Sequence, residues 1–444
     1  MNNSFYRKIK DILKRKAIKD IFTLQMATFI NQGINIVVSI IIARLLGVEG
    51  YGIYALIFVF TGLISLANLG YTRVAVVLLP VAHHKKDSQE VLNILSYLFK
   101  INLFFYLPLY ILLIIFAPLV TDALYHNPQV GDLARLVIIS MLINSFASIL
   151  NLNLEATRKM NFLAIMENSS LFLKSLLVIL FLFFGLGLWG VAFGYLLSAA
   201  ITASVSFVIY FLWSRRNEML PSILNIIKNV SRLGWRYNLK FSASMAADNN
   251  LGKFLSQLPL FVLSLIAPVS LVGFYKIALS YVNLPHMVIS SISRLLNVKF
   301  AQDRAIDINL LKKNFYRSSL YFGVLFIVLL IIFAVLASWL IPLLYGNEFK
   351  QAVNISYWLA IALAFTGFTL GFGPIYRAFK KTHLSIIFNV VRSFIGLMIF
   401  VILFYIVGFS VLTSVLAFKI FLGPPTIPIH FWFIKKKVLD KFKS

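Results

Sequence analysis

The sequence predicts an all-α membrane protein with twelve transmembrane helices, arranged as two six-helix lobes that are related as parallel repeats. Apolar residues make up 60% of the 444 residues, charged residues only 13%, and the mean hydropathy is +0.89. A soluble core could not hide that much apolar surface from water. Because about 20 apolar residues cross the roughly 30 Å of bilayer hydrocarbon, the ends of the apolar runs locate the spans.

Six spans are expected in the first half of the chain, at 21–46, 51–79, 91–117, 134–154, 163–184 and 189–212. A basic segment precedes them, in which Phe5, Ile9, Ile12 and Leu13 recur at helical spacing. This pattern is typical of a helix lying on the membrane surface. Since the first apolar run is too long for a signal peptide, no cleavable signal peptide is expected.

Six more spans are expected at 238–266, 273–298, 315–341, 353–375, 386–407 and 409–434. The longest polar break, with an amphipathic stretch at 219–236, falls between the two sets. We therefore predict an N-terminal lobe at 1–213, a cytoplasmic linker helix at 214–236 and a C-terminal lobe at 237–444. In the last span, Gly423, Pro424, Pro425 and Pro428 are expected to end or bend the helix.

An internal repeat supports the division into lobes. Residues 46–56 read LGVEGYGIYAL after span one, and residues 267–279 read APVSLVGFYKIAL after span seven. Three identities align at one offset: Val48, Gly52 and Tyr54 with Val269, Gly273 and Tyr275. A second match pairs the turn after span four with the turn after span ten: Ala156, Arg158 and Lys159 with Ala378, Lys380 and Lys381. Six is an even number of spans, so the two copies cross the membrane in the same direction and form parallel repeats.

The basic residues predict the orientation. They gather on one side of the membrane, at 7–19, 85–86, 158–159, 215–236, 299–317, 377–381 and 435–443, whereas the connections on the other side offer only Lys350. The positive-inside rule then places both termini of this multi-pass protein in the cytoplasm. The net charge of +26 is explained by anionic membrane lipids as partners, and no nucleic-acid partner is expected.

Cations inside the spans are the strongest functional signal. Lys100, Lys174, Lys253 and Lys419 lie about half-way along spans three, five, seven and twelve, and Arg392 lies within span eleven. A charge at the centre of a span costs about 2.5–3.5 kcal/mol, so four lysines cost on the order of 10–14 kcal/mol unless they face water or an anion. We predict a shared cationic cavity for an anion, and we include Arg44 in it, although Arg44 could also reach the lipid head groups. The alternative is a set of scattered polar contacts between helices.

Polar side chains predict which helices line that cavity. Span one carries Asn31 and Asn35 on one helical face, and span seven carries Asn250 and Gln257 near Lys253, followed by Pro259. Sites in transporters commonly lie at broken helices of this kind. The competing interpretation is that these amides only join helices.

The run ARLLGVEGYGIYALIFVFTGLISLANLGY, from Ala43 to Tyr71, resembles the first two helices of the polysaccharide (Wzx-type) flippases. These belong to the multidrug/oligosaccharidyl-lipid/polysaccharide exporter (MOP) superfamily. Chain length, twelve spans and the basic turn at 156–159 extend the resemblance to the whole chain. It implies a cell-membrane transporter that flips a polyprenyl-pyrophosphate-linked oligosaccharide to the outer leaflet by alternating access. It also implies an anionic lipid-linked glycan as substrate and other polysaccharide-assembly proteins as partners, but it assigns no individual residue.

Two alternative functions fit the sequence less well. A multidrug cation antiporter of the same superfamily would be expected to carry an acidic residue in its first helix, and span one has none. A membrane polymerase or ligase acting on lipid-linked glycans would need a larger outer domain. With no cysteine, no phosphate-binding glycine loop and no paired metal-ligand spacing, no enzyme activity, cofactor or metal site is predicted. Asp248 and Glu167 are candidates for proton or sodium coupling, or else salt-bridge partners of Lys253 and Lys174.

Overall fold

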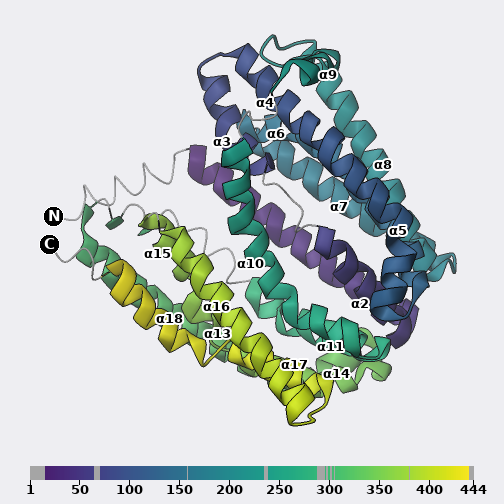
Figure 1. The fold of residues 1–444 in the computed structure, drawn as a ribbon, viewed down its shortest axis with the longest axis vertical. Coiled ribbons are helices and arrows are strands. Elements are labelled where there is room, and N and C mark those ends of the chain that lie inside the picture. The colour runs from purple at the N-terminus through teal and green to yellow at the C-terminus, as the bar shows by residue number, and fades with distance from the viewer. Residues whose placement is uncertain are drawn as a thin grey trace. The chain divides into compact units, whose positions relative to one another are not determined.

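A computed structural model describes residues 16–64, 71–157, 159–234, 239–287, 306–379 and 381–439, together with 296, 299, 300, 303 and 304 (Figure 1). All regular elements among these residues are helices, and no strand is found in them. Nine of the described helices are long and apolar enough to cross a membrane, and three shorter apolar helices accompany them. The predicted all-α membrane class is confirmed.

The longest helix contains the first predicted span and the first part of the second. Helix α2 runs from Lys16 to Ile64, but Gly47 inside it has φ 67° and ψ −173°, so two helices meet there. A positive φ of this kind favours glycine. The break lies where the sequence analysis ended span one.

The other helices follow the predicted spans closely. In the first half of the chain they are α3 (Tyr71–His84), α4 (Ser88–Ile101), η2 (Asn102–Tyr106), α5 (Leu107–Tyr125), α6 (Pro128–Ala156), α7 (Met160–Phe183), α8 (Gly187–Ser214) and α9 (Ile223–Arg232). In the second half they are α10 (Leu239–Ile266), α11 (Val269–Val282), α13 (Ile308–Tyr345), η3 (Asn347–Phe349), α14 (Gln351–Leu363), η4 (Thr366–Thr369), α15 (Phe372–Ala378), α16 (Thr382–Val401), η5 (Ile402–Ile406), α17 (Val411–Phe421), α18 (Thr426–Ile434) and η6 (Lys435–Leu439). Gly423, Pro424 and Pro425 separate α17 from α18, as predicted, whereas α10 continues through Pro259.

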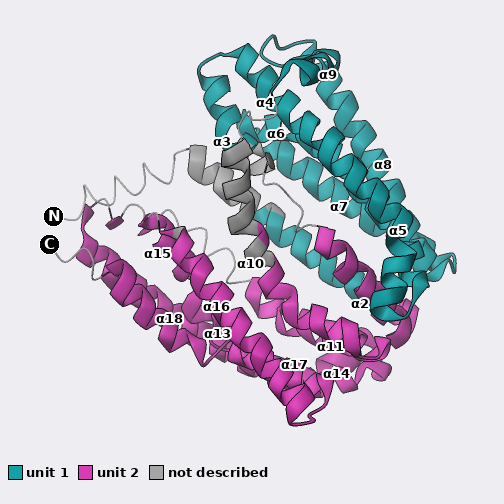
Figure 2. Cartoon of the chain, in the orientation of Figure 1, with its two compact units in different colours: residues 1–42, 67–247 teal, residues 43–66, 248–444 magenta. Residues whose placement is uncertain are grey.

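The chain forms two compact units (Figure 2). Unit 1 contains residues 1–42 and 67–247, and unit 2 contains residues 43–66 and 248–444. This grouping differs from the predicted lobes at residues 43–66, which belong with the second half of the chain. The lobe boundaries at 213 and 237 stay a prediction.

The linker helix α9 is docked on α4 within unit 1. Ser96 of α4 donates a hydrogen bond to the carbonyl of Ile226 at 3.2 Å, and the Asn229 amide donates to Asn93 and Ser96, each at 3.2 Å. Ile226 is buried on the same side of the helix as Val230. Because one face of this amphipathic helix is covered by protein, the linker forms part of the first unit.

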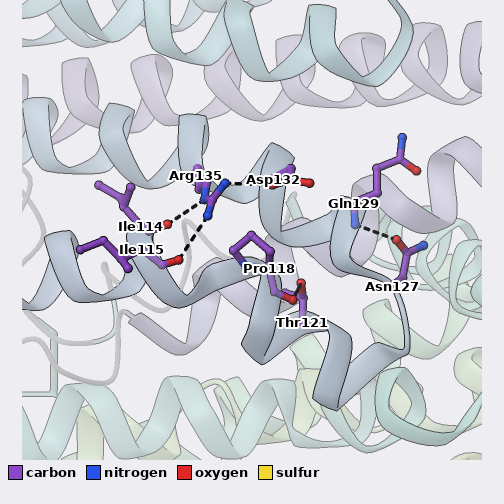
Figure 3. Close-up of polar contacts among 8 residues, drawn as sticks. All are labelled: Ile114, Ile115, Pro118, Thr121, Asn127, Gln129, Asp132 and Arg135. Carbon is purple, nitrogen blue, oxygen red and sulfur yellow. Dashed lines mark hydrogen bonds and ion pairs between the residues drawn. The ribbon is translucent and has the colours of Figure 1, made fainter.

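The packing of α5 against α6 in unit 1 is built around a proline (Figure 3). Pro118 has no N–H, so the carbonyl of Ile114, four residues earlier, loses its helical donor. Arg135 of α6 replaces it, because its Nε donates to Ile114 at 2.8 Å and its Nη2 to Ile115 at 3.2 Å. Gly131, one turn earlier, allows the approach, since a Cβ there would lie 2.5 Å from the carbonyl carbon of Ala117 and overlap the backbone of Pro118.

In unit 2, the two copies of the sequence repeat contact each other reciprocally. A Cβ on Gly52 of α2 would overlap the carbonyl oxygen of Val269, and a Cβ on Gly273 of α11 would lie 2.9 Å from the carbonyl oxygen of Val48. Since Gly52 aligns with Gly273 and Val48 with Val269, each repeat presents its glycine to the other's valine. This is the contact pattern of a two-fold axis. It also explains why residues 43–66 group with unit 2.

Candidate functional site

A cavity of about 310 Å³ lies within unit 2. Its walls come from α10, α14, η4, α16, α17 and α18, and its lining residues are Leu255, Ser256, Ala362, Leu363, Thr366, Thr369, Asn389, Arg392, Lys419, Leu422, Gly423 and Ile427. This lining contains two cations and no Asp or Glu among the described residues. The cavity is therefore suited to an anion.

Arg392 is only partly satisfied by the protein. Its Nη1 donates to the carbonyl of Leu422 at 3.0 Å, while its Nε is buried and has no hydrogen-bond partner. In the described parts of the chain the single salt bridge is Arg135–Asp132, so neither Arg392 nor Lys419 is neutralised by a described carboxylate. Two uncompensated cations inside membrane-spanning helices favour an anionic ligand between them.

Local sequence brings these groups together. Asn389 and Arg392 are three residues apart on α16 and so share a helical face. Lys419 lies in the last turn of α17, next to the α16 helix that α17 packs against. Beyond Lys419, the turn at Gly423 approaches α14 so closely that a Cβ there would overlap the carbonyl oxygen of Ala362. The predicted proline break thus closes one wall of the cavity.

Three other cations that were predicted to line the cavity instead contact backbone carbonyls or an aromatic ring of the protein. The ammonium of Lys100, whose side chain is 6% exposed, donates to the carbonyl of Leu233 at 2.6 Å, at the end of the linker helix. Lys174 lies over the ring of Tyr195, 4.9 Å from its centroid. Arg44 donates to the carbonyls of Leu343 and Leu344, in the last turn of α13, where a helix lacks internal donors and favours a cation.

The remaining predicted residues are not gathered into this cavity by the described structure. Asn35 is exposed and donates to the carbonyl of Asn31 on its own helix at 2.9 Å. Asn250 is half-buried, and Gln257 and Glu167 are exposed. The side chains of Lys253 and Asp248 lie outside the described residues. The structure therefore joins Arg392 and Lys419, and the wider cavity of six cations stays a prediction.

Sequence reasoning missed the polar lining that α10, η4 and α16 supply. Ser256, Thr366, Thr369 and Asn389 all line the cavity. The three-residue spacing of Thr366 and Thr369, and of Asn389 and Arg392, could have indicated two polar faces inside apolar spans. Which faces meet depends on tertiary packing.

Comparison with known proteins places the chain in a family. A profile of the family described as "Polysaccharide biosynthesis protein" matches residues 17–296, which is more than half of the chain. The chain belongs to this family. The resemblance drawn from Ala43 to Tyr71 is confirmed, because that run lies inside the matched region. No curated protein matches the chain.

Solved structures share the fold of this polysaccharide biosynthesis protein at low identity. An inward-facing multidrug resistance MATE family transporter of the MOP superfamily is 16% identical, with a TM-score of 0.68 over 93% of this chain and 96% of that one. The eukaryotic MATE transporter AtDTX14 is 15% identical, with a TM-score of 0.65 over 96% of each chain. The chain is thus a multi-pass membrane protein with the MATE-like fold, which has twelve transmembrane helices in two lobes.

Proposed function

We propose that this transporter moves a polyprenyl-pyrophosphate-linked oligosaccharide, a polysaccharide repeat unit, from the cytoplasmic leaflet to the outer leaflet by alternating access. The observation that carries the proposal is the cavity in unit 2 that holds Arg392 and Lys419 without a described carboxylate. Such a substrate is an anion with many hydrogen-bond acceptors. Guanidinium and ammonium groups match it through charge-assisted hydrogen bonds.

The same cavity argues against the export of cationic drugs, an activity suggested by the names of the structurally similar MATE transporters. At an effective dielectric constant of about 20, two unit charges about 5 Å apart interact with about 3 kcal/mol. A drug cation would be repelled by both Arg392 and Lys419, whereas an anion would be attracted by both. Electrostatics therefore favours lipid-linked glycan over multidrug efflux.

The proposal includes the cell membrane as the location and the cytoplasm as the side of both termini. The basic clusters at 215–236 and 377–381 support it, since cytoplasmic loops carry excess Lys and Arg. Anionic membrane lipids and other polysaccharide-assembly proteins are the expected partners. Proton or sodium coupling through Asp248 or Glu167 stays a prediction.

The test is the pool of lipid-linked glycan in a strain that lacks the protein. We expect the glycan to accumulate on the cytoplasmic side, and the wild-type chain to restore export. The double variant Arg392→Gln, Lys419→Gln should fail to restore it at matched protein levels, whereas Arg135→Gln, an arginine in a span outside the cavity, should restore it in proportion to the folded protein. Normal glycan export in the deletion strain, together with new sensitivity to cationic drugs, would favour the multidrug alternative.

A further inference from the structure

Four of the hydrogen-bonding side chains that line the cavity in unit 2 fall into two kinds. Arg392 and Lys419 are cationic donors. Thr366 and Thr369 carry hydroxyls that already donate to the protein, Thr366 to the carbonyl of Leu363 at 2.7 Å and Thr369 to the carbonyl of Thr366 at 2.8 Å. A hydroxyl has one proton and two lone pairs, so while these bonds are kept the two oxygens serve a ligand as acceptors.

This pattern discriminates between anions. A pyrophosphate offers only acceptors, which suit the two cations, but Thr366 and Thr369 could donate to it only by giving up their bonds to the backbone. A sugar that carries a carboxylate offers both kinds of partner: the carboxylate accepts from Arg392 and Lys419, and the ring hydroxyls donate to the threonines. The guanidinium of Arg392 lines the cavity and has one backbone acceptor, the carbonyl of Leu422, so N–H groups are left for a carboxylate.

The size of the cavity agrees with a ligand of this kind. Its volume of about 310 Å³ lies at the lower end of the range of small-molecule sites, about 300–1,000 Å³. Apolar side chains such as Leu255 and Leu363 complete the walls and can cover the C–H face of a sugar ring.

We infer that the cavity of Arg392, Lys419, Thr366 and Thr369 is a specificity site for a sugar-borne carboxylate, and thus that the transported glycan contains an acidic sugar such as a uronate. This inference rests on the proposed function. The shared chemistry is an oxyanion, which could come from the sugar or from the pyrophosphate of the lipid, and the two experiments below separate these sources.

The first experiment measures binding with the purified full-length protein in detergent. Sodium glucuronate should raise the unfolding temperature more than equal concentrations of glucose or pyrophosphate, because a ligand stabilises the state that binds it. Arg392→Gln and Lys419→Gln should each abolish the shift, and Arg135→Gln should keep it. Thr369→Val removes the acceptor at constant shape, and it should weaken the response to glucuronate severalfold without changing the response to acetate. A larger shift with pyrophosphate than with glucuronate, or an undiminished shift in Arg392→Gln, would overturn the inference.

The second experiment measures flipping in proteoliposomes with two polyprenyl-pyrophosphate disaccharides, one ending in glucuronate and one in glucose. Arg392→Gln and Lys419→Gln should lower the rate for the glucuronate substrate about ten- to a hundredfold, the range of one charge-assisted hydrogen bond, and should lower the rate for the glucose substrate much less. Equal loss for both substrates would assign the cavity to the pyrophosphate and overturn the inference while keeping the proposed function. If the wild type flips neither substrate, the proposed function is wrong, and so is the inference that the cavity selects a transported glycan. A rise of the unfolding temperature with glucuronate would then indicate a carboxylate site that serves another activity.

Discussion

Arg135 in unit 1 and Arg392 in unit 2 are both arginines of membrane-spanning helices, yet their surroundings are opposite. The guanidinium of Arg135 is satisfied by the protein. It donates to the carbonyls of Ile114 and Ile115 and pairs with Asp132 at 3.0 Å. Arg392 has one backbone acceptor, a buried Nε without a partner and a second cation in the same cavity. A charge within an apolar span is therefore no functional signal by itself; the acceptors around it decide.

Backbone carbonyls without a helical donor explain the structural cations. Pro118 leaves the carbonyl of Ile114 inside α5 without its helical donor, and Arg135 covers it. The end of α13 exposes the carbonyls that Arg44 covers, and the end of the linker helix exposes the carbonyl that Lys100 covers. Each of these cations replaces a hydrogen bond that the helix cannot make by itself. Arg392 differs from these cations. One backbone carbonyl accepts from its guanidinium, so most of its N–H groups are left for other acceptors.

The largest effect is expected from Gly131→Ala, which attacks the packing that brings Arg135 to Pro118. The added Cβ would meet backbone atoms of Pro118 and Ala117, and backbone cannot turn away as a flexible side chain can. We expect a loss of at least about 3 kcal/mol of unfolding free energy. Thermal unfolding of the purified protein in detergent measures it.

Gly33→Ala is the matched control, since a Cβ there meets no atom within 4 Å. It should change stability by less than about 1 kcal/mol, in the stabilising direction, because alanine favours a helix over glycine. Similar losses in the two variants would mean that the approach of α6 to Pro118 does not constrain unit 1.

The second-largest effect is expected when the same substitution, Arg→Gln, is made at Arg135 and at Arg392, which tests the comparison directly. Arg135→Gln leaves the carbonyl of Ile114 without a donor and removes the bond to Ile115, and it should cost about 1–3 kcal/mol of unfolding free energy, with transport per folded molecule unchanged. Arg392→Gln should change stability by less than about 1 kcal/mol and lower the export of a glycan that carries a carboxylate about ten- to a hundredfold. Unfolding in detergent and glycan export at matched protein levels are the two readouts. If Arg135→Gln abolished transport without destabilising the protein, the division into structural and functional cations would be wrong.

The sequence specified the spans well because apolar length and helix breakers are local properties. Span one was expected to end at residue 46, one residue before the joint at Gly47, and the interruption after Phe421 was expected from Gly423 and the prolines that follow it. The roles of the cations could not be expected from the sequence, because they depend on partners far along the chain. Arg44 and Leu344, for example, are separated by 300 positions. Lys100 shows the difficulty, since its helix begins at Ser88, earlier than the apolar run suggests, and its partner Leu233 belongs to the linker.

A third, smaller effect is expected from Lys419→Met, which removes one of the two cations in the cavity while keeping an unbranched side chain. Without a bound anion, two like charges in one cavity destabilise the fold, so the variant should gain up to about 1 kcal/mol in unfolding free energy. Unfolding with and without added glucuronate tests this. A clear loss of stability in the absence of any anion would show that Lys419 has a structural role like that of Arg135.

The smallest effect should come from Asp132→Asn, which removes the acid beside Arg135 and leaves both carbonyl bonds in place. The two side chains are 40% and 41% exposed, and an ion pair that is this open is screened and contributes only about 0–1 kcal/mol. The variant should therefore unfold nearly like the wild type, and added salt should remove the remaining difference. A loss as large as that of Arg135→Gln would mean that Asp132, and not the carbonyls of Ile114 and Ile115, is what holds Arg135 in unit 1. The contrast with Arg392 would then be the presence of a carboxylate, and placing an acid three residues before Arg392, by Asn389→Asp, should convert the cavity cation into a structural one and stop transport. If the carbonyls dominate, as the distances of 2.8 and 3.2 Å indicate, Asn389→Asp should lower transport by competing with the anion while adding little stability.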